Sequence, residues 1–238
     1  MSDAATGVGI DAMAARVGSI AERIRAAALR ADRDPAAVTI VGVSKTFPRE
    51  ALDAAYAAGI RVFAESRVQE AKEKLAMPLP DDASVHLIGQ LQTNKVKPAI
   101  ALFDVIESVD RANLVDALAR EAAKQERVVD VLLQVNVARE AQKAGCDPDD
   151  APILLDEIVA SGTLRCLGLM TIAPLVKDPQ DARATFKDLR LLQEELRQRH
   201  PDAPLDILSM GMSNDFEVAV EEGATHVRIG RAIFGSRG

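Results

Sequence analysis

The sequence predicts an α/β fold, a single-domain (β/α)8 TIM barrel over residues 1–238, and three observations support it. Eight short apolar segments alternate with segments of helical periodicity, the order expected of a parallel sheet. One extra helical segment precedes the first strand and none follows the last, so in a closed ring an N-terminal helix would fill the position of the missing last helix. There is no linker, no shift in composition and no Gly-x-Gly-x-x-Gly turn after the first strand. An open doubly wound sheet is the alternative that the periodicity of strands and helices does not exclude.

The first helix is expected over residues 10–31, where apolar residues recur at helical spacing among Arg and Glu side chains. Asp34 and Pro35 separate this helix from the first strand, where β-branched residues dominate positions 38–43. Pro48 begins the next helix, because proline is well tolerated in a first helical turn, and Gly59 ends it.

The same alternation continues to the carboxyl end of the chain. The later strands are expected at residues 60–64, 85–88, 104–108, 129–135, 164–170, 205–210 and 226–234. The helices that follow the first seven strands are expected at residues 48–58, 68–76, 95–102, 111–124, 149–160, 180–199 and 214–222.

Composition and charge exclude several classes of protein. The chain is 48% hydrophobic and 27% charged, values that are ordinary for a globular protein. Its net charge is −7 without a basic block, so we expect no nucleic-acid partner. No apolar run approaches the roughly 20 residues that cross a bilayer, and the first thirty residues lack a signal sequence. We therefore expect a cytoplasmic protein without a membrane partner. Cys146 and Cys166 form neither a disulfide framework nor a metal motif, so no metal is expected.

Lys45 is the first candidate for a functional residue. It follows the buried strand 38–43, and such a strand delivers polar side chains to its carboxyl end. A lysine at that place is partly desolvated, which lowers the pKa of its amine and lets it attack a carbonyl carbon to form an imine. The alternative is an ordinary lysine at the rim of the barrel.

A candidate phosphate site follows the seventh strand, at residues 209–214, which read Ser-Met-Gly-Met-Ser-Asn. Gly211 would let the backbone approach a ligand, and Ser213 at the start of a helix could donate to an anion. The alternative is that Ser213 or Asn214 only caps the helix. Gly230 and Arg231 lie in the eighth strand, and phosphate sites of such barrels are often built after strands seven and eight, which favours the phosphate site.

Arg228 is expected to point into the barrel. If Val227 and Ile229 face the helices, the alternation of a strand turns Arg228 and Gly230 inward. Its acceptor is then either a carboxylate such as Glu65 or a ligand atom such as a heterocyclic nitrogen. An amine, an inward arginine and a phosphate site together describe a receptor for pyridoxal 5′-phosphate.

These residues resemble the pyridoxal phosphate homeostasis protein family, whose members are similar to the barrel half of alanine racemase. The resemblance rests on the segments 43–46 (VSKT), 88–95 (IGQLQTNK), 168–170 (GLM), 209–213 (SMGMS), 228–230 (RIG) and 233–235 (IFG). It implies that Lys45 carries the internal aldimine, that Ser213 and the backbone at Gly230 and Arg231 hold the phosphate, and that Arg228 approaches the pyridine nitrogen. Ser66 stands where the family usually has Asn in a Gly-Glu-Asn motif. The residues that we expect to bind the cofactor are Lys45, Ser66, Asn94, Met212, Ser213, Arg228, Gly230 and Arg231.

The expected function is storage, buffering or delivery of pyridoxal phosphate without committed catalysis. An arginine at the ring nitrogen makes the ring a weak electron sink. The racemase-like second base is a tyrosine from an additional domain, and this chain shows neither that domain nor a tyrosine other than Tyr56. We expect a monomer, with apo forms of pyridoxal-phosphate-dependent enzymes as further partners. The alternatives are a racemase-like enzyme with another second base and a cofactor-free class I aldolase-like barrel.

Overall fold

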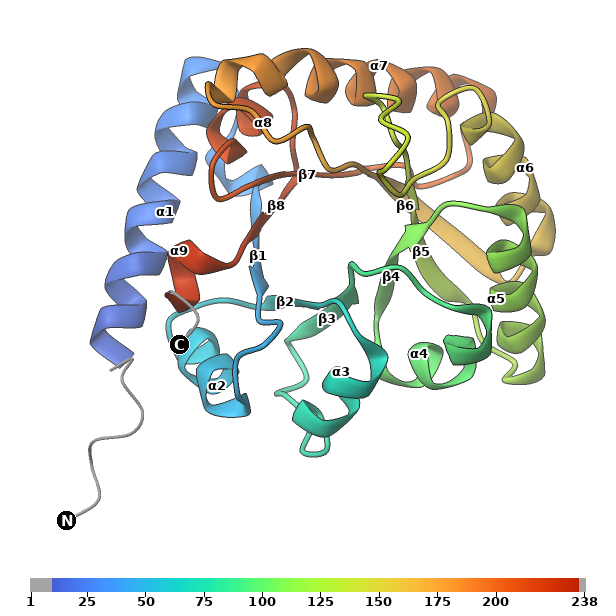
Figure 1. Cartoon of the computed structure of the whole chain (residues 1–238), viewed down its shortest axis with the longest axis horizontal. Helices are drawn as coiled ribbons and strands as arrows, with labels where there is room; N and C mark the ends of the chain where they lie inside the picture. Colours follow the sequence, from blue (N-terminus) through green and yellow to red (C-terminus); the bar gives the residue numbers. More distant parts are fainter. Residues whose placement is uncertain (1–9, 236–238) are drawn as a thin grey trace.

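Eight parallel strands close into one barrel in the computed structural model, which describes residues 10–235 (Figure 1). Each strand pairs with the next along the chain, and β8 pairs with β1. This closure confirms the predicted barrel and excludes the open sheet. The strands are β1 (Thr39–Val43), β2 (Val62–Glu65), β3 (Ser84–Leu87), β4 (Val105–Val109), β5 (Val129–Gln134), β6 (Leu164–Met170), β7 (Ile207–Met212) and β8 (His226–Ile229).

The helices surround this ring of strands (Figure 1). They are α1 (Ile10–Arg30), α2 (Arg49–Ala57), α3 (Val68–Lys74), α4 (Val96–Leu102), α5 (Ala112–Lys124), α6 (Ala151–Ser161), α7 (Arg183–Arg199), α8 (Phe216–Glu221) and α9 (Arg231–Phe234). Short 3-10 turns occur at η1 (Pro35–Ala37), η2 (Thr93–Lys95) and η3 (Pro179–Ala182). Most bounds lie within two residues of the predicted ones.

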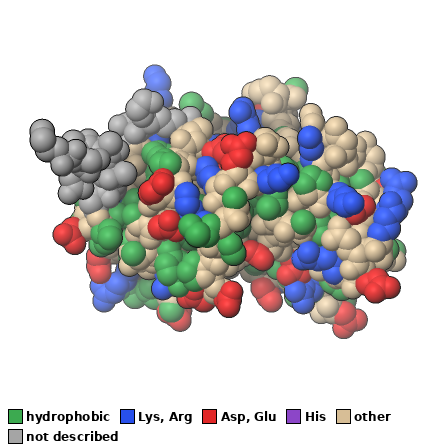
Figure 2. Space-filling view, turned by 90° about the horizontal axis from the view of Figure 1, so that it is seen from below, with side chains coloured by type: hydrophobic (Ala, Val, Ile, Leu, Met, Phe, Trp, Pro, Cys, Tyr) green, Lys and Arg blue, Asp and Glu red, His purple; other side chains and the backbone are tan. Residues whose placement is uncertain are grey.

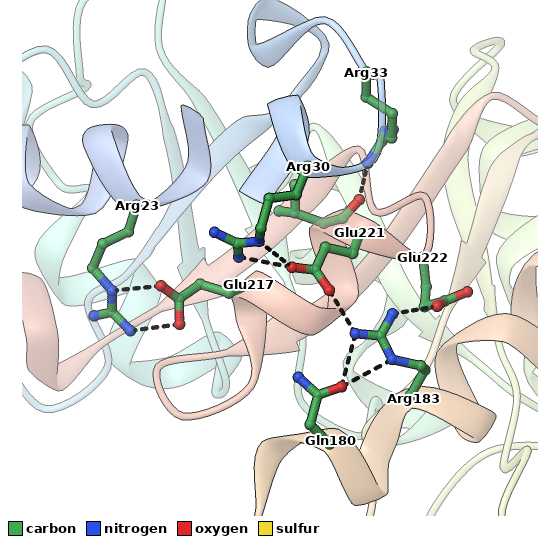
Figure 3. A network of polar contacts seen from close by, with 9 residues as sticks. Arg23, Arg30, Arg33, Gln180, Arg183, Glu217, Glu221 and Glu222 are labelled. Carbon is green, nitrogen blue, oxygen red and sulfur yellow. Dashed lines mark hydrogen bonds and ion pairs between the residues drawn. The ribbon is translucent and has the colours of Figure 1, made fainter. Parts of the chain in front are cut away.

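Helix α1 occupies the gap in the helical layer beside α8, as predicted. Its buried face includes Met13, Ile20 and Ile24. Charged side chains along its edge reach α8, where Arg23 pairs with Glu217, and Arg30 bonds Glu221 (Figure 3). Arg183 at the start of α7 also bonds Glu221 and Glu222, so one ion-pair network joins three helices (Figure 3).

The end of the chain differs from the prediction. We expected the eighth strand to run to residue 234 with no helix after it, but β8 ends at Ile229 and one turn of helix, α9, follows. Gly230 ends the strand with φ −105° and ψ −90°. The turn then buries Ile233 and Phe234, and the Phe234 ring stacks on Phe47 with 5.2 Å between centroids. The single turn is too short to cover β1 and β8, which leaves the gap for α1.

The barrel has an apolar outer layer and a centre that combines polar and apolar side chains. One large cluster of buried side chains fills the space between strands and helices, and it includes Phe63, Ile106 and Leu208. Two small apolar clusters lie elsewhere, one around Val41, Val43 and Ala64 and one around Val105, Leu132 and Met170. The residues of these small clusters alternate with those of the outer layer along each strand, which places them inside the barrel.

Two further findings concern the surface. Acidic and basic side chains are interspersed on the face shown in Figure 2. Among residues 10–235, none of the helices combines the length and the apolar character needed to cross a membrane.

Candidate functional site

Lys45 lies at the rim of the barrel, immediately after β1. Val41 and Val43 face the interior, whereas a side chain at Gly42 would meet Ile60 and Phe234 in the helical layer. Ser44 also faces that layer, since its hydroxyl donates to a carboxylate held by α3. The alternation therefore directs Lys45 to the barrel side, where it is partly exposed.

A buried clamp holds the backbone on both sides of Lys45. The Lys74 amine donates to the Ser44 carbonyl and to Glu65 Oε1, each at 2.8 Å, and pairs with Glu70 at 2.7 Å. The Thr46 N–H donates to Glu70 in turn. Thr46 has φ 69°, a left-handed conformation that is costly for a β-branched residue, so these bonds stabilise an unfavourable turn.

This clamp was not predicted from the sequence, although the spacing of Glu70 and Lys74 indicates an ion pair on α3. Glu65 is fully buried, and its second oxygen has no partner among the described residues. Burial raises the pKa of Glu65, while the hydrogen bonds from Lys74 and Ser44 oppose that rise. Glu65 therefore belongs to the helical side of β2.

Arg228 points into the barrel, as the alternation in β8 predicts, but its partner is not Glu65. Its two terminal nitrogens donate to Ser209 Oγ at 2.7 Å and to the Thr171 carbonyl at 2.6 Å. The Ser209 hydroxyl donates to Glu107 Oε2 at 2.6 Å. The carboxylate considered at the sequence level was therefore the wrong one, because β2 turns Glu65 outward whereas β4 turns Glu107 inward.

Two histidines complete the polar centre of the barrel. His86 Nδ1 lies 2.7 Å from Glu107 Oε1, and the His86 and His226 rings stack with 6.1 Å between centroids. Burial alone would raise the pKa of Glu107, but the bond and charge of His86 and the charge of Arg228 outweigh it, and the pKa is lowered to about 2. Burial lowers the pKa of His226 to about 4. Glu107 was not singled out from the sequence.

The end of β7 and the loop after it form neither the ligand approach at Gly211 nor the helix cap that the sequence suggested. Gly211 has φ 87°, and a Cβ there would lie 2.6 Å from Ala219 Cβ and 2.9 Å from Phe216 Cα. The Gly211 backbone therefore packs closely on α8, and this packing alone explains why glycine is required at this position. Neither Ser213 nor Asn214 caps α8, whose N-cap position is Asp215.

Asp215 instead folds back onto the loop, and its carboxylate accepts the Met212 N–H at 2.6 Å. Met212, the last residue of β7, is paired with Arg228 of β8, so the loop begins beside the arginine. Ser213 is partly exposed, and within residues 10–235 its hydroxyl has no hydrogen-bond partner, unlike that of Ser209.

The structure brings most of the predicted site residues to one edge of the ring. Gly230 lies against β1, since a Cβ built on Gly230 would lie 3.5 Å from the Val43 carbonyl oxygen. The ends of β1, β7 and β8 are therefore neighbours. Ser66 follows β2 on the barrel side, next to Gly89. Arg231 is exposed at the start of α9. Asn94 is exposed in η2, which packs against α4 and α5, so it is not brought to the β7 and β8 edge.

Three polar groups at this edge have no partner within the described residues. They are the Lys45 amine, the Ser213 hydroxyl and the Arg228 Nε, in contrast to the bonded amines of Lys74 and Lys143. An amine, a hydroxyl donor and a guanidinium donor fit a small anionic aldehyde with a ring nitrogen. Among residues 10–235, no group of three or more His, Cys, Asp or Glu side chains could hold a metal ion.

The closed barrel and its rim lysine define a class of protein. The family described as alanine racemase, N-terminal domain, matches residues 15–238, and the chain belongs to this class. Within it, a protein from Aquifex aeolicus named pyridoxal phosphate homeostasis protein is 44% identical over 222 residues, which is 93% of this chain and 97% of the relative. A Pseudomonas aeruginosa protein of the same name is 42% identical over 94% of this chain and 96% of the relative. The chain belongs to the pyridoxal phosphate homeostasis protein family.

Solved structures support the same conclusion. PipY of Synechococcus elongatus, described with pyridoxal phosphate bound, is 42% identical, with a TM-score of 0.79 over 91% of this chain and 100% of that one. Alanine racemase from Streptomyces coelicolor is 19% identical with a TM-score of 0.75, and the match covers 59% of its chain. The racemase shares the fold of this chain.

Proposed function

We propose that this protein binds pyridoxal 5′-phosphate covalently through Lys45 and stores, buffers or delivers it without committed catalysis. The observation that carries this proposal is the set of three unpartnered donors, on Lys45, Ser213 and Arg228, at one edge of the barrel. Relatives with the same family name and the ligand described for PipY support the identity of the cofactor.

Five of the expected residues would have distinct parts in binding. The Lys45 amine would bond the aldehyde carbon, and the aldehyde oxygen would leave as water. The Ser213 hydroxyl with the backbone of Gly230 and Arg231 would donate to the phosphate. Arg228 Nε–H would donate to the pyridine nitrogen. The bound group would supply an electron sink, and an arginine at its nitrogen weakens that sink because a cation disfavours protonation of the ring.

The position of Tyr56 supports a protein without committed turnover. Racemisation requires a base on each face of the substrate. Tyr56 lies on α2 in the helical layer, and its hydroxyl bonds Asp82 at 2.6 Å. This tyrosine is therefore not placed to act at the barrel mouth. The racemase and aldolase alternatives both need another group for the proton transfer.

One spectrum tests the proposal. Wild-type protein mixed with pyridoxal phosphate should show a yellow absorbance band, and borohydride should bleach that band and fix one cofactor mass to Lys45. Lys45→Ala should lose both signals, whereas Lys97→Ala, which changes an exposed lysine on α4, should keep them. A wild-type protein that cannot be loaded would refute the proposal and favour the aldolase.

Catalysis and delivery are tested separately. Loaded protein incubated with a panel of amino acids in deuterium oxide should leave their α-hydrogens unexchanged, and rapid exchange would establish the racemase alternative. Delivery is tested by mixing loaded protein with an apo-enzyme. A transfer rate that rises with apo-enzyme concentration beyond the rate of spontaneous release indicates direct contact, and a rate independent of that concentration indicates buffering through free cofactor.

A further inference from the structure

A chain of buried hydrogen bonds links β3, β4, β7 and β8 across the inside of the barrel. His86 bonds one oxygen of Glu107, and Ser209 bonds the other. Arg228 donates to Ser209, and its remaining terminal nitrogen donates to the Thr171 carbonyl. Glu107 and Ser209 are both 0% exposed and Arg228 is 3% exposed, so no solvent competes for these bonds.

The direction of each bond in this chain is fixed. An ionised carboxylate only accepts, so the Ser209 hydroxyl must give its hydrogen to Glu107. The same hydroxyl oxygen then has a lone pair aligned for the Arg228 guanidinium, which only donates. Without the carboxylate, the hydroxyl could rotate and would no longer specify one orientation of the arginine.

The charges favour the same arrangement. Arg228 is a buried cation, and a buried charge without a partner is strongly destabilising. Glu107 supplies the opposite charge through the intervening Ser209 hydroxyl, whose oxygen lies 2.6 Å from Glu107 Oε2 and 2.7 Å from an Arg228 nitrogen. Two of the three guanidinium nitrogens are thereby committed to protein atoms, and the third, Nε, has no acceptor within residues 10–235.

We infer that Glu107 is a positioning residue for the cofactor, which acts through Ser209 to hold Arg228 so that Nε–H is the donor offered to the pyridine nitrogen. This inference rests on the proposed function and extends it to a residue that touches neither the cofactor nor its phosphate. Glu107 would thus help to keep the ring nitrogen an acceptor, and with it the weak electron sink of a carrier.

The test compares Glu107→Gln, Ser209→Ala and the double variant. Each single variant should release pyridoxal phosphate roughly tenfold faster than wild type. Each removes at least one charge-assisted hydrogen bond of the chain, and the loss of one such bond corresponds to a change of about tenfold. Each should also shift the absorbance maximum of the bound chromophore. Because both act through one pathway, the double variant should be no worse than either single variant.

A matched control separates positioning from loss of stability. Gln193 is 5% exposed on α7, and its amide bonds the Leu205 carbonyl at 2.6 Å, outside the barrel. Gln193→Met should lower the melting temperature yet leave the release rate and spectrum unchanged. If Glu107→Gln does not fold, Ser209→Ala, which loses one oxygen atom, carries the test alone.

Three results would overturn the inference. These are release from the single variants at the wild-type rate, an unshifted spectrum in both variants, or a double variant whose effects multiply. All three require that wild-type protein first shows the lysine-bound cofactor. Failure at that earlier step would refute the proposed function, so the two failures are distinguishable.

Discussion

Gly211 shows how a single residue fixes the geometry beside the site. It is the second-last residue of β7, with φ 87°, and a side chain there would collide with Phe216 and Ala219 of α8. This close packing on α8 fixes the end of β7, which carries Met212 and leads directly to Ser213.

We expect Gly211→Ala to destabilise the protein by about 2–4 kcal/mol, because it adds left-handed strain and overpacking. Urea unfolding measures the change. Gly18→Ala is the matched control, since Gly18 lies in α1 with nothing within 4 Å of an added Cβ, and alanine there should stabilise the helix by about 0.5–1 kcal/mol. Equal effects of the two substitutions would contradict this explanation.

His226 gives the protein a pH-dependent stability. Its pKa is lowered to about 4 by burial, from an ordinary value of 6.5. Between these values the unfolded state binds a proton that the folded state does not, so stability falls as pH falls from about 6.5 to about 4, by up to about 1.4 kcal/mol per pH unit.

His226→Gln should flatten this slope. The comparison of wild type and variant by urea unfolding between pH 5 and 6.5 isolates the contribution of His226, because Glu65 is common to both proteins and Glu107 contributes only at lower pH. With its folded pKa at about 2 and an ordinary value of 4.5, Glu107 adds stability above about pH 4.5 that is lost toward pH 2. An unchanged slope in the variant would show that another group is responsible.

At the scale of elements, α1 is held mainly by its apolar face. Ile20 is 3% exposed against the barrel, while Arg23 and Glu217 keep 44% and 37% of their side chains exposed. We expect Ile20→Ala to cost about 2–5 kcal/mol and Arg23→Ala less than about 1 kcal/mol, since exposed ion pairs contribute little. Equilibrium unfolding of both variants tests this, and a larger loss from Arg23→Ala would reverse the conclusion.

Helix α3 anchors the turn that carries Lys45. The Lys74 side chain is 9% exposed, and its amine donates to one oxygen of Glu65 and to the Ser44 carbonyl. Lys74→Met leaves the Glu65 carboxylate buried and unpaired, so we expect a loss of about 3–5 kcal/mol near neutral pH. Lys72→Met, which changes an exposed residue of the same helix, should be nearly silent.

The loss in Lys74→Met should depend on pH. Without Lys74, the folded-state pKa of Glu65 rises further, and the folded protein then holds a proton that the unfolded chain has released. Stability of the variant should therefore fall as pH rises above about 4.5, the ordinary pKa of Glu65. Unfolding measured at pH 5 and pH 8 decides this, and equal losses at both would refute the role of Glu65.

At the scale of the whole molecule, we expect binding and folding to be linked, because β1, β7 and β8 all contribute residues to the proposed site. Pyridoxal phosphate at 100 times its dissociation constant should raise the unfolding free energy by about 2.7 kcal/mol. Thermal unfolding with and without the cofactor measures this gain. Lys45→Ala should show a much smaller gain at the same concentration, and an equal gain would mean that the lysine contributes little to affinity.

Much of this architecture was predictable from the sequence. The strand and helix periods specify eight strands, the first seven each followed by a helix. Parallel strands bring their carboxyl ends to one edge, so Lys45, Ser213 and Arg228 were expected near each other. The inward direction of Arg228 was predicted on the condition that Val227 and Ile229 face the helices. These features depend on local periodicity, which a sequence displays directly.

Only the tertiary structure decided which polar groups meet. Glu65 and Glu107 both lie near the ends of short apolar strands, and a period of two does not say which of the two faces is the barrel side. That choice depends on how the helices pack outside, and it turned Glu65 toward Lys74 and Glu107 toward Ser209. The end of β8 was decided in the same way, because burial of Phe234 against Phe47 favours a helical turn where the sequence alone reads as a continuous strand.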